Sequence, residues 1–149
     1  MNDHGNHRHR RFLTVTVAAL LGTAATAMAA PMDKLPPEHR QGPVRYVSGG
    51  IGKDQSTQML RDASMFPLAL EFVQGGNKQH ALYLADVQVQ IKDAAGKRVL
   101  DTHADGPFLL ARLPDGHYTV SAEHAGQTKV RSVQVAQGKH QRIVFDWAP

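Results

Sequence analysis

The sequence predicts a mostly β fold: a single antiparallel β-sandwich of about seven strands with one short N-terminal helix. Three observations predict it. The 149 residues, 42% hydrophobic and 20% charged, are ordinary globular proportions and suit one domain. From Leu68 onward the hydrophobic residues recur with a period of two, which is typical of strands. Turn-forming residues interrupt this alternation about every ten residues, a spacing typical of a sandwich.

Residues 1–29 are predicted to be an export signal. A basic stretch with three arginines precedes the apolar residues 12–30, which close with Ala27-Met28-Ala29. This order indicates a secretory signal peptide that is cleaved after Ala29. The alternative is a membrane anchor, because the apolar stretch approaches the length that spans a bilayer. We expect a periplasmic or secreted protein with no membrane span after processing.

Charge and cysteine content exclude several functions. Three arginines leave with the signal, and the basic residues that remain alternate with acids. Nucleic-acid binding needs a concentrated basic face, so we expect no nucleic-acid partner. The chain has no cysteine, which excludes disulfides, thiolate metal sites and a cysteine nucleophile.

The segment before the strands has three parts. Residues 30–43 contain four prolines and almost no large hydrophobic residue, so they are predicted to be a flexible leader. The domain then covers residues 44–149, and residues 44–47 are a short strand or a docking segment. A helix is expected to begin at Asp54 or Ser56 and to run to about residue 64, before Pro67.

This helix is expected to be part of the domain. Met59, Leu60 and Ala63 form a hydrophobic stripe along it. We expect the stripe to pack over one end or edge of the sheet, so that residues 44–74 are integral to the fold.

The loop before the helix is the candidate partner contact: Gly49, Gly50, Ile51, Gly52, Lys53 and Asp54. Its glycines would leave backbone groups accessible to a partner. The alternative is that they only let the chain reverse tightly before the helix. A phosphate-binding loop needs glycine and serine or threonine where this sequence has Val47 and Asp54, so no nucleotide site is predicted.

The strands follow in order. The first expected strands cover 68–73, 82–92 and 99–100, with a turn at 75–77 and a hairpin turn at 93–97 between them. In the next strand Phe108 and Leu110 share a face, and after a turn at 113–116 a further strand has Tyr118, Val120 and Ala122 inward. A turn at 125–126 leads to a strand over 127–135, and the last strand has Ile143, Phe145 and Trp147 on one side. The hydrophobic alternation shifts between Val130 and Val133, which predicts a bulge.

Residues 85 to 147 contain motifs that resemble a known family. The string Leu113-Pro114-Asp115-Gly116-His117-Tyr118-Thr119-Val120 resembles the Leu-Pro-x-Gly-x-Tyr-x-Val turn of the carboxypeptidase regulatory-like domains. The run Asp86–Ile91, the Asp93…Gly96 turn and Asp105-Gly106-Pro107-Phe108 extend the resemblance. It implies a transthyretin-like (prealbumin-like) β-sandwich, shared with collagen-adhesin B-type repeats, and a non-catalytic module.

The physical role of the turn is structural. Pro114 is expected to fix the first φ of the turn, and Gly116 to take its strained position. Leu113 and Tyr118 are expected to pack beneath it.

The remaining histidines show no spacing that would place two metal ligands side by side on one element: His39, His80, His103, His117, His124 and His140. No serine lies in a Gly-x-Ser-x-Gly elbow. We therefore assign no catalytic residue, no metal site and no cofactor.

The leading hypothesis is an exported, non-catalytic bacterial envelope module that binds a protein or glycan partner or acts structurally. The first alternative is an enzyme or a hydrolase accessory subunit with a site near the Gly49–Asp54 loop. The second is a weak metal or ligand carrier that uses His103 and His117.

Overall fold

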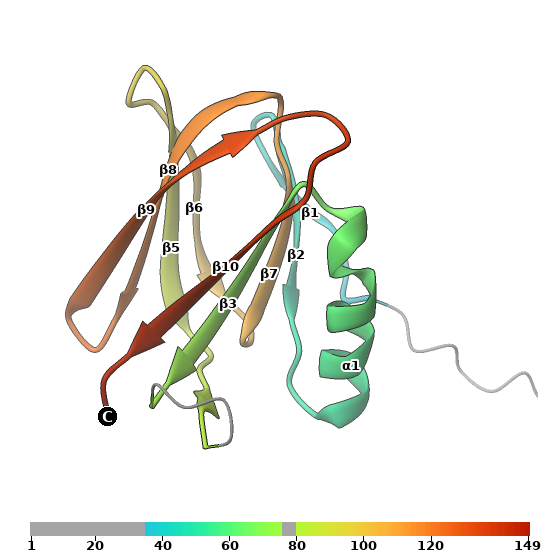
Figure 1. The fold of residues 1–149 in the computed structure, drawn as a ribbon, viewed down its shortest axis with the longest axis vertical. Coiled ribbons are helices and arrows are strands. Elements are labelled where there is room, and N and C mark those ends of the chain that lie inside the picture. Colours follow the sequence, from blue (N-terminus) through green and yellow to red (C-terminus); the bar gives the residue numbers. More distant parts are fainter. Residues whose placement is uncertain (1–34, 76–79) are drawn as a thin grey trace, which may run out of the picture. The chain divides into compact units, whose positions relative to one another are not determined.

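Two β-sheets lie face to face around a hydrophobic core, and a helix covers the outer face of one of them (Figure 1). The computed structural model describes residues 35–75 and 80–149; the predicted signal peptide and residues 30–34 of the predicted leader lie outside the described residues. The elements of the described part are β1 (His39–Gln41), β2 (Val44–Gly49), α1 (Lys53–Asp62), the 3-10 helix η1 (Ala63–Met65), β3 (Leu68–Gln74), β4 (Leu82–Tyr83), β5 (Val87–Asp93), β6 (Arg98–Ala104), β7 (Phe108–Arg112), β8 (Gly116–His124), β9 (Gln127–Val135) and β10 (Gln141–Trp147).

The first sheet has the strand order β1-β2-β7-β3-β10, with β4 paired to β3, and the second has the order β6-β5-β8-β9. Strands β3 and β10 pair in parallel, and every other pair is antiparallel. The predicted mostly β sandwich with one short helix is confirmed. The described part has more strands than the seven predicted, in part because β1 and β4 have only three and two residues. Strands of two or three residues are too short to show a hydrophobic alternation in the sequence.

Alternating residues of the long strands form the core between the sheets. Tyr118, Val120 and Ala122 of β8 point inward, and Phe145 and Trp147 of β10 meet them from the first sheet. These orientations confirm the strand faces predicted from the period of two.

The central strands β3 and β7 of the first sheet are buried on both faces. Phe108 and Leu110 share a face, as predicted, and pack against the helix, whereas Leu109 and Ala111 face the second sheet. A sheet that is covered on both sides needs hydrophobic residues at consecutive positions. This explains the continuous apolar run of β7.

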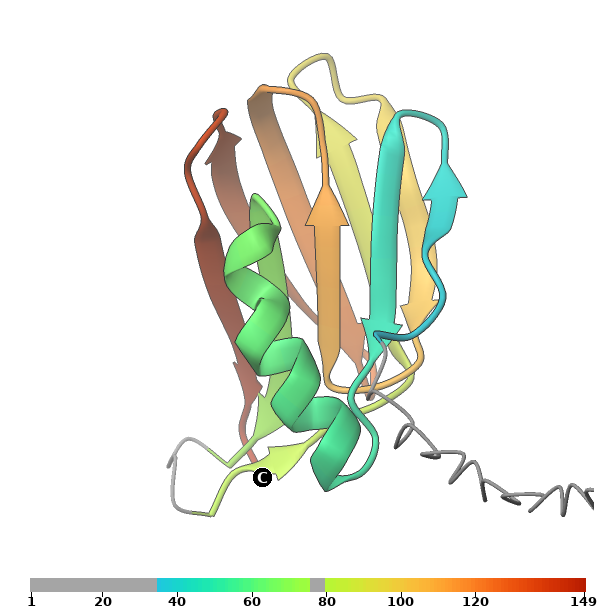
Figure 2. The ribbon, with the colours of Figure 1, turned by 90° about the vertical axis from the view of Figure 1, so that its right-hand side faces the viewer.

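Helix α1 lies across the outer face of the first sheet (Figure 2). Met59 is fully buried and Ala63 is 8% exposed, but Leu60 is 41% exposed. The predicted packing over an end or edge of the sheet is therefore wrong, and so is the place of Leu60 in the buried stripe. The reason is the apolar outer surface of β2, β3 and β7, which offers the helix more contact than an edge would.

The predicted flexible leader is wrong for its last residues. His39–Gln41 pairs antiparallel with Val44–Tyr46. The His39 ring also stacks on the Tyr46 ring, with 5.4 Å between centroids. Backbone pairing and this ring contact hold the segment on the edge of the first sheet, although its side chains are exposed.

The predicted strand over 82–92 is two strands in different sheets. Leu82–Tyr83 pairs with β3 of the first sheet, and Val87–Asp93 belongs to the second. Asp86, with φ at 58°, lies between them and lets the chain change direction. Its amide donates to the Ala104 carbonyl at 2.8 Å, which starts the second sheet.

The predicted bulge in the strand over 127–135 is absent. The β8–β9 register is regular from end to end, and Val130 faces outward, 51% exposed, while Val133 and Val135 face the core. One outward valine produced the apparent shift in the alternation. The register of the second sheet shifts instead between Ile91 and Lys92, in the β5–β6 pair.

Leu113 and Tyr118 pack in the turn before β8, as predicted. Leu113 and Tyr118 are buried, and the Tyr118 hydroxyl donates to the Pro114 carbonyl at 2.7 Å. Gly116 has φ at 158°, within the positive range that residues with a side chain rarely adopt. The expectation that a glycine takes the strained position of this turn is confirmed.

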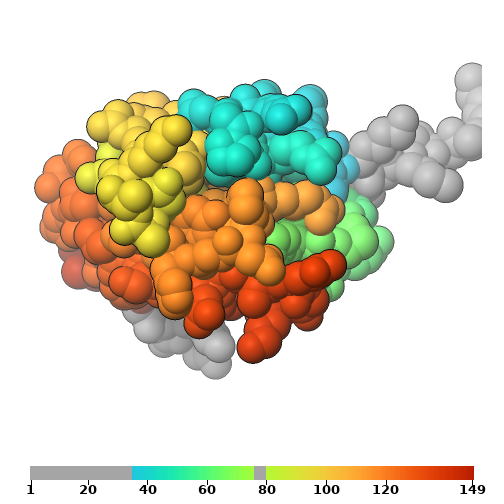
Figure 3. Space-filling model, turned by 90° about the horizontal axis from the view of Figure 1, so that it is seen from above, coloured from blue at the N-terminus to red at the C-terminus, as the bar shows by residue number. Residues whose placement is uncertain are grey.

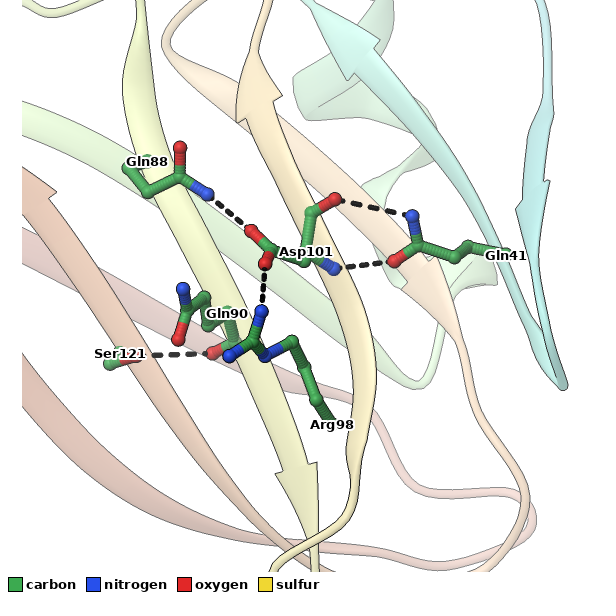
Figure 4. Close-up of polar contacts among 6 residues, drawn as sticks. All are labelled: Gln41, Gln88, Gln90, Arg98, Asp101 and Ser121. Carbon is green, nitrogen blue, oxygen red and sulfur yellow. Dashed lines mark hydrogen bonds and ion pairs between the residues drawn. The ribbon is translucent and has the colours of Figure 1, made fainter.

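Side chains join the sheets at both open sides of the sandwich. On one side, the Gln41 amide pairs with the backbone of Asp101 in β6 (Figure 4). The Asp101 carboxylate in turn accepts from Gln88 and Arg98. On the other side, the Trp147 indole donates to the Gln127 carbonyl at 3.0 Å.

Candidate functional site

The candidate loop joins β2 to α1, and its first half is folded tightly. Gly49 and Gly50 are buried. The Gln55 side-chain oxygen accepts from the Gly50 amide at 2.8 Å and from the Ile51 amide at 3.2 Å. These two amides are therefore satisfied within the chain, and the expectation that they lie open to a partner is wrong.

The first glycines of the loop have structural reasons. Gly50 has φ at 98°, and a Cβ there would lie 2.4 Å from Cδ2 of Phe108. A Cβ on Gly106 would lie 2.4 Å from the Gly49 carbonyl oxygen, so these two backbones touch. Gly52 differs: its φ is 85°, but a Cβ there would meet nothing within 4 Å. Close packing thus accounts for Gly49, Gly50 and Gly106, whereas Gly52 only supplies the positive φ before the helix.

The second half of the loop is exposed and borders a groove. Ile51 is 66% exposed, and Lys53 begins α1 beside it. The groove encloses about 490 Å³ and is lined by Gly50, Ile51, Gly52, Lys53, Ser56, Tyr83, Ala85 and Pro107. Asp54 is exposed in the first turn of α1 and does not line the groove. Four of the six predicted loop residues line this groove, and Gly49 and Asp54 do not.

Strand β4 provides the opposite wall. Tyr83 is 55% exposed, and its ring centroid lies 5.6 Å from that of Phe108. The pairing of Val73 with Tyr83 holds this wall against the end of β3. An exposed aromatic ring that rests on a buried one is held in place before any partner arrives, so its contact costs little conformational entropy.

The groove combines apolar walls with few polar groups. Ile51, Tyr83, Ala85 and Pro107 supply the apolar surface, and the Lys53 ammonium supplies charge at its border. The Ser56 hydroxyl donates to the Lys53 carbonyl at 2.9 Å, so it is engaged within the helix. Exposed apolar and aromatic residues with a polar border are typical of binding surfaces.

Sequence reasoning missed Tyr83, Ala85 and Pro107. They lie far from the loop in sequence, and they meet it only because β4 pairs with β3 and because Gly49 contacts Gly106. The available signal is Leu82-Tyr83, two large hydrophobic residues that the sequence pattern assigns to a longer strand.

His103 and His117 cannot share a ligand. Both lie on the outer face of the second sheet, where His103 is level with Gln88 and Glu123. His117 lies six residues from Glu123 along β8, or about 20 Å at roughly 3.4 Å per residue. His103 instead approaches the Asp86 carboxylate, at 3.1 Å. Within residues 35–75 and 80–149, no three His, Asp or Glu residues form a group that could hold a metal ion.

The turn before β8 contains one group with a shifted pKa, the Tyr118 hydroxyl. Burial raises the pKa of the Tyr118 hydroxyl above its ordinary 10.0, and the nearby carboxylates of Asp93 and Asp115 raise it further. The phenol therefore stays protonated at neutral pH and donates to the Pro114 carbonyl. Tyr118 therefore has a structural role, which is to stabilise the turn.

Comparison with known proteins adds no assignment: no protein-family model and no curated protein matches the chain. Among the helices of the described residues, none is both long and apolar enough to cross a bilayer.

Proposed function

We propose that the chain is an exported, non-catalytic module of the bacterial cell envelope, a carboxypeptidase regulatory-like β-sandwich that binds a protein partner through the groove beside Gly49–Asp54. The proposal rests on the groove. Ile51 and Tyr83, both more than half exposed, line it together. The signal-like residues 1–29 support export, and the turn at Leu113–Tyr118 supports the family.

A protein is the partner that the groove favours. Leu82, next to Tyr83, is 65% exposed, which extends the apolar surface at this end of the sandwich. Clustered exposed apolar residues of this kind are typical of protein contacts. Figure 2 shows β4 close to the start of α1, so both sides of the groove rest on regular elements. A glycan partner would use the same Tyr83 ring, and the experiment below separates the two.

Co-purification from an envelope fraction tests this function. Tagged wild type is compared with Ile51→Ser/Tyr83→Ser and with the control Val130→Ser/Val144→Ser, which removes two exposed valines elsewhere. The proposal expects one protein at constant stoichiometry with wild type and control, and at least tenfold less with the groove variant. Equal recovery from all three would contradict it. If wild type and the control variant bind purified cell-wall polysaccharide and the groove variant does not, the partner is a glycan and not a protein.

A further inference from the structure

The end of the sandwich away from this groove holds a basic hollow. It encloses about 580 Å³ where η1, the β7–β8 turn and the β9–β10 turn meet. Figure 3 views this end: the green segment after α1 lies set back between the orange β7–β8 region and the red β9–β10 turn. Arg112, Lys139 and His140 all line it. We propose that this hollow binds the oxyanion group, phosphate or carboxylate, of a small anionic ligand.

Arg112 is held in position for such a role. Its Nη1 donates to the Met65 carbonyl at 2.8 Å, and its guanidinium carbon lies 4.2 Å above the centre of the Phe66 ring. These two contacts fix the plane of the guanidinium. No other hydrogen bond of this side chain occurs within the part of the chain that the structure describes, which leaves N–H donors for a ligand. A fixed guanidinium suits an oxyanion because its paired donors match two oxygens.

Lys139 brings further positive charge to the same hollow, and His140 lies beside it in the lining. The His140 Nδ1 lies 2.7 Å from the Phe66 carbonyl oxygen. A carbonyl only accepts, so Nδ1 carries the proton of this bond, which fixes the ring in the wall of the hollow. Lys139 is exposed, and its amide donates to the Ala136 carbonyl, which closes the turn that carries both residues.

The charges of this hollow are not neutralised within the chain. Among the described residues, neither Arg112 nor Lys139 has a carboxylate oxygen within 4.0 Å, whereas Arg45, Arg98 and Arg142 each have one. Asp115 is the single carboxylate among the lining residues. Two permanent positive charges with one negative charge leave a local excess that favours an anion.

The site is independent of the proposed function. The groove lies at the Lys53 end of α1, and the hollow follows its other end, at Met65 (Figure 1). The exposed side chain of Met65 and the Phe66 ring add an apolar wall. A ligand with an oxyanion head on a less polar body would contact both parts.

Nuclear magnetic resonance titration of the protein from residue 30 onward tests the inference. Inorganic phosphate and sodium glucuronate are added at constant ionic strength, with chloride as reference. Saturable shifts confined to amides of residues 65–66 and 138–140 are expected. Lys139→Gln should weaken binding about fivefold, as the loss of one charge-assisted contact implies, and Arg112→Lys at least as much. Lys129→Gln makes the same charge change in β9, at a residue that lines neither the groove nor the hollow, and should leave binding unchanged.

Vesicles distinguish the source of the oxyanion. A lipid head group would be assigned if the protein co-sediments with phosphatidylglycerol vesicles but not with phosphatidylcholine vesicles. Lys139→Gln should then reduce co-sedimentation, and Lys129→Gln should not. Phosphate or glucuronate shifts without co-sedimentation would assign a free anion. If no probe gives shifts beyond chloride, or if Lys139→Gln and Lys129→Gln change binding equally, the site is wrong. Thermal midpoints of both Lys139→Gln and Arg112→Lys within about 3 °C of wild type confirm intact folding.

Discussion

The side-chain amide of Gln41 pairs with the backbone of Asp101 as a strand would. Its Nε2 donates to the Asp101 carbonyl at 3.2 Å, and its Oε1 accepts from the Asp101 amide at 2.5 Å (Figure 4). Gln41 ends β1 of the first sheet, and Asp101 lies in β6, an edge strand of the second. One side chain thus links the two sheets and occupies backbone groups that an edge strand would otherwise present to another chain.

Replacing Gln41 with Ala should lower the free energy of unfolding by about 1 kcal/mol, because two hydrogen bonds between the sheets are lost at an exposed position. Urea denaturation followed by circular dichroism measures the change. Gln137→Ala, in the exposed β9–β10 turn, is the control and should stay within about 0.5 kcal/mol of wild type. Equal stability of both variants would show that the link between the sheets contributes nothing.

Gly50→Ala should be far more destabilising than Gly52→Ala. Both glycines have positive φ, at 98° and 85°, so each substitution costs about 1–2 kcal/mol of backbone strain. At Gly50 the added methyl also meets the Phe108 ring, which adds about 1–3 kcal/mol of overpacking. Thermal and chemical denaturation of the pair measure the difference. Similar costs at the two positions would contradict the close contact between the loop and Phe108.

Met59→Ala and Leu60→Ala test the position of the helix. Met59 is fully buried against the outer face of the first sheet, so its truncation should cost about 2–5 kcal/mol. Leu60 is 41% exposed, and its truncation should cost less than about 1 kcal/mol. The free energies of unfolding of the two variants provide the measurement. A larger loss for Leu60→Ala would mean that the helix is turned the other way on the sheet.

Tyr118→Phe should lower the free energy of unfolding by about 1 kcal/mol at pH 7, because the hydrogen bond to the Pro114 carbonyl is lost. The pH dependence has a definite sign. The folded state holds the phenol proton more tightly than the unfolded state, since burial raises its pKa above 10.0. This contribution is fully present below pH 10 and declines as the pH rises through the folded-state pKa.

Wild type should therefore lose stability more steeply than Tyr118→Phe above pH 10. Denaturation curves of both proteins between pH 8 and pH 11 check this, with the Phe variant as the control for lysine titration. Parallel curves would contradict the raised pKa of Tyr118.

The strand alternation made much of the fold predictable. Tyr118, Val120 and Ala122 face the core because one face of β8 is buried and the other is wet, so a period of two is visible in the residues themselves. The same reasoning fails where burial changes. Leu82-Tyr83 is apolar but exposed, and the chain passes to the other sheet at Asp86, where φ is 58°. A single positive φ at an aspartate leaves no mark on the hydrophobic pattern.

One of the two walls of the candidate site could be predicted from the sequence. The loop at Gly49–Asp54 was visible from its glycines, and it borders a groove. The opposite wall, with Tyr83 and Pro107, depends on strand pairing between residues distant in sequence. The parallel pairing of β3 with β10 and the link from Gln41 to Asp101 depend equally on tertiary structure. No local pattern encodes such contacts.

Site-specific photocrosslinking tests the central claim, that the groove binds a protein partner, most directly. A photoreactive phenylalanine analogue replaces Tyr83 in one variant and Val130 in another; both positions are more than half exposed, and Val130 lies on the second sheet. After irradiation of intact cells, the account predicts one discrete protein adduct from position 83 and none from position 130. Adducts of equal intensity from both positions, or from position 130 alone, would contradict it.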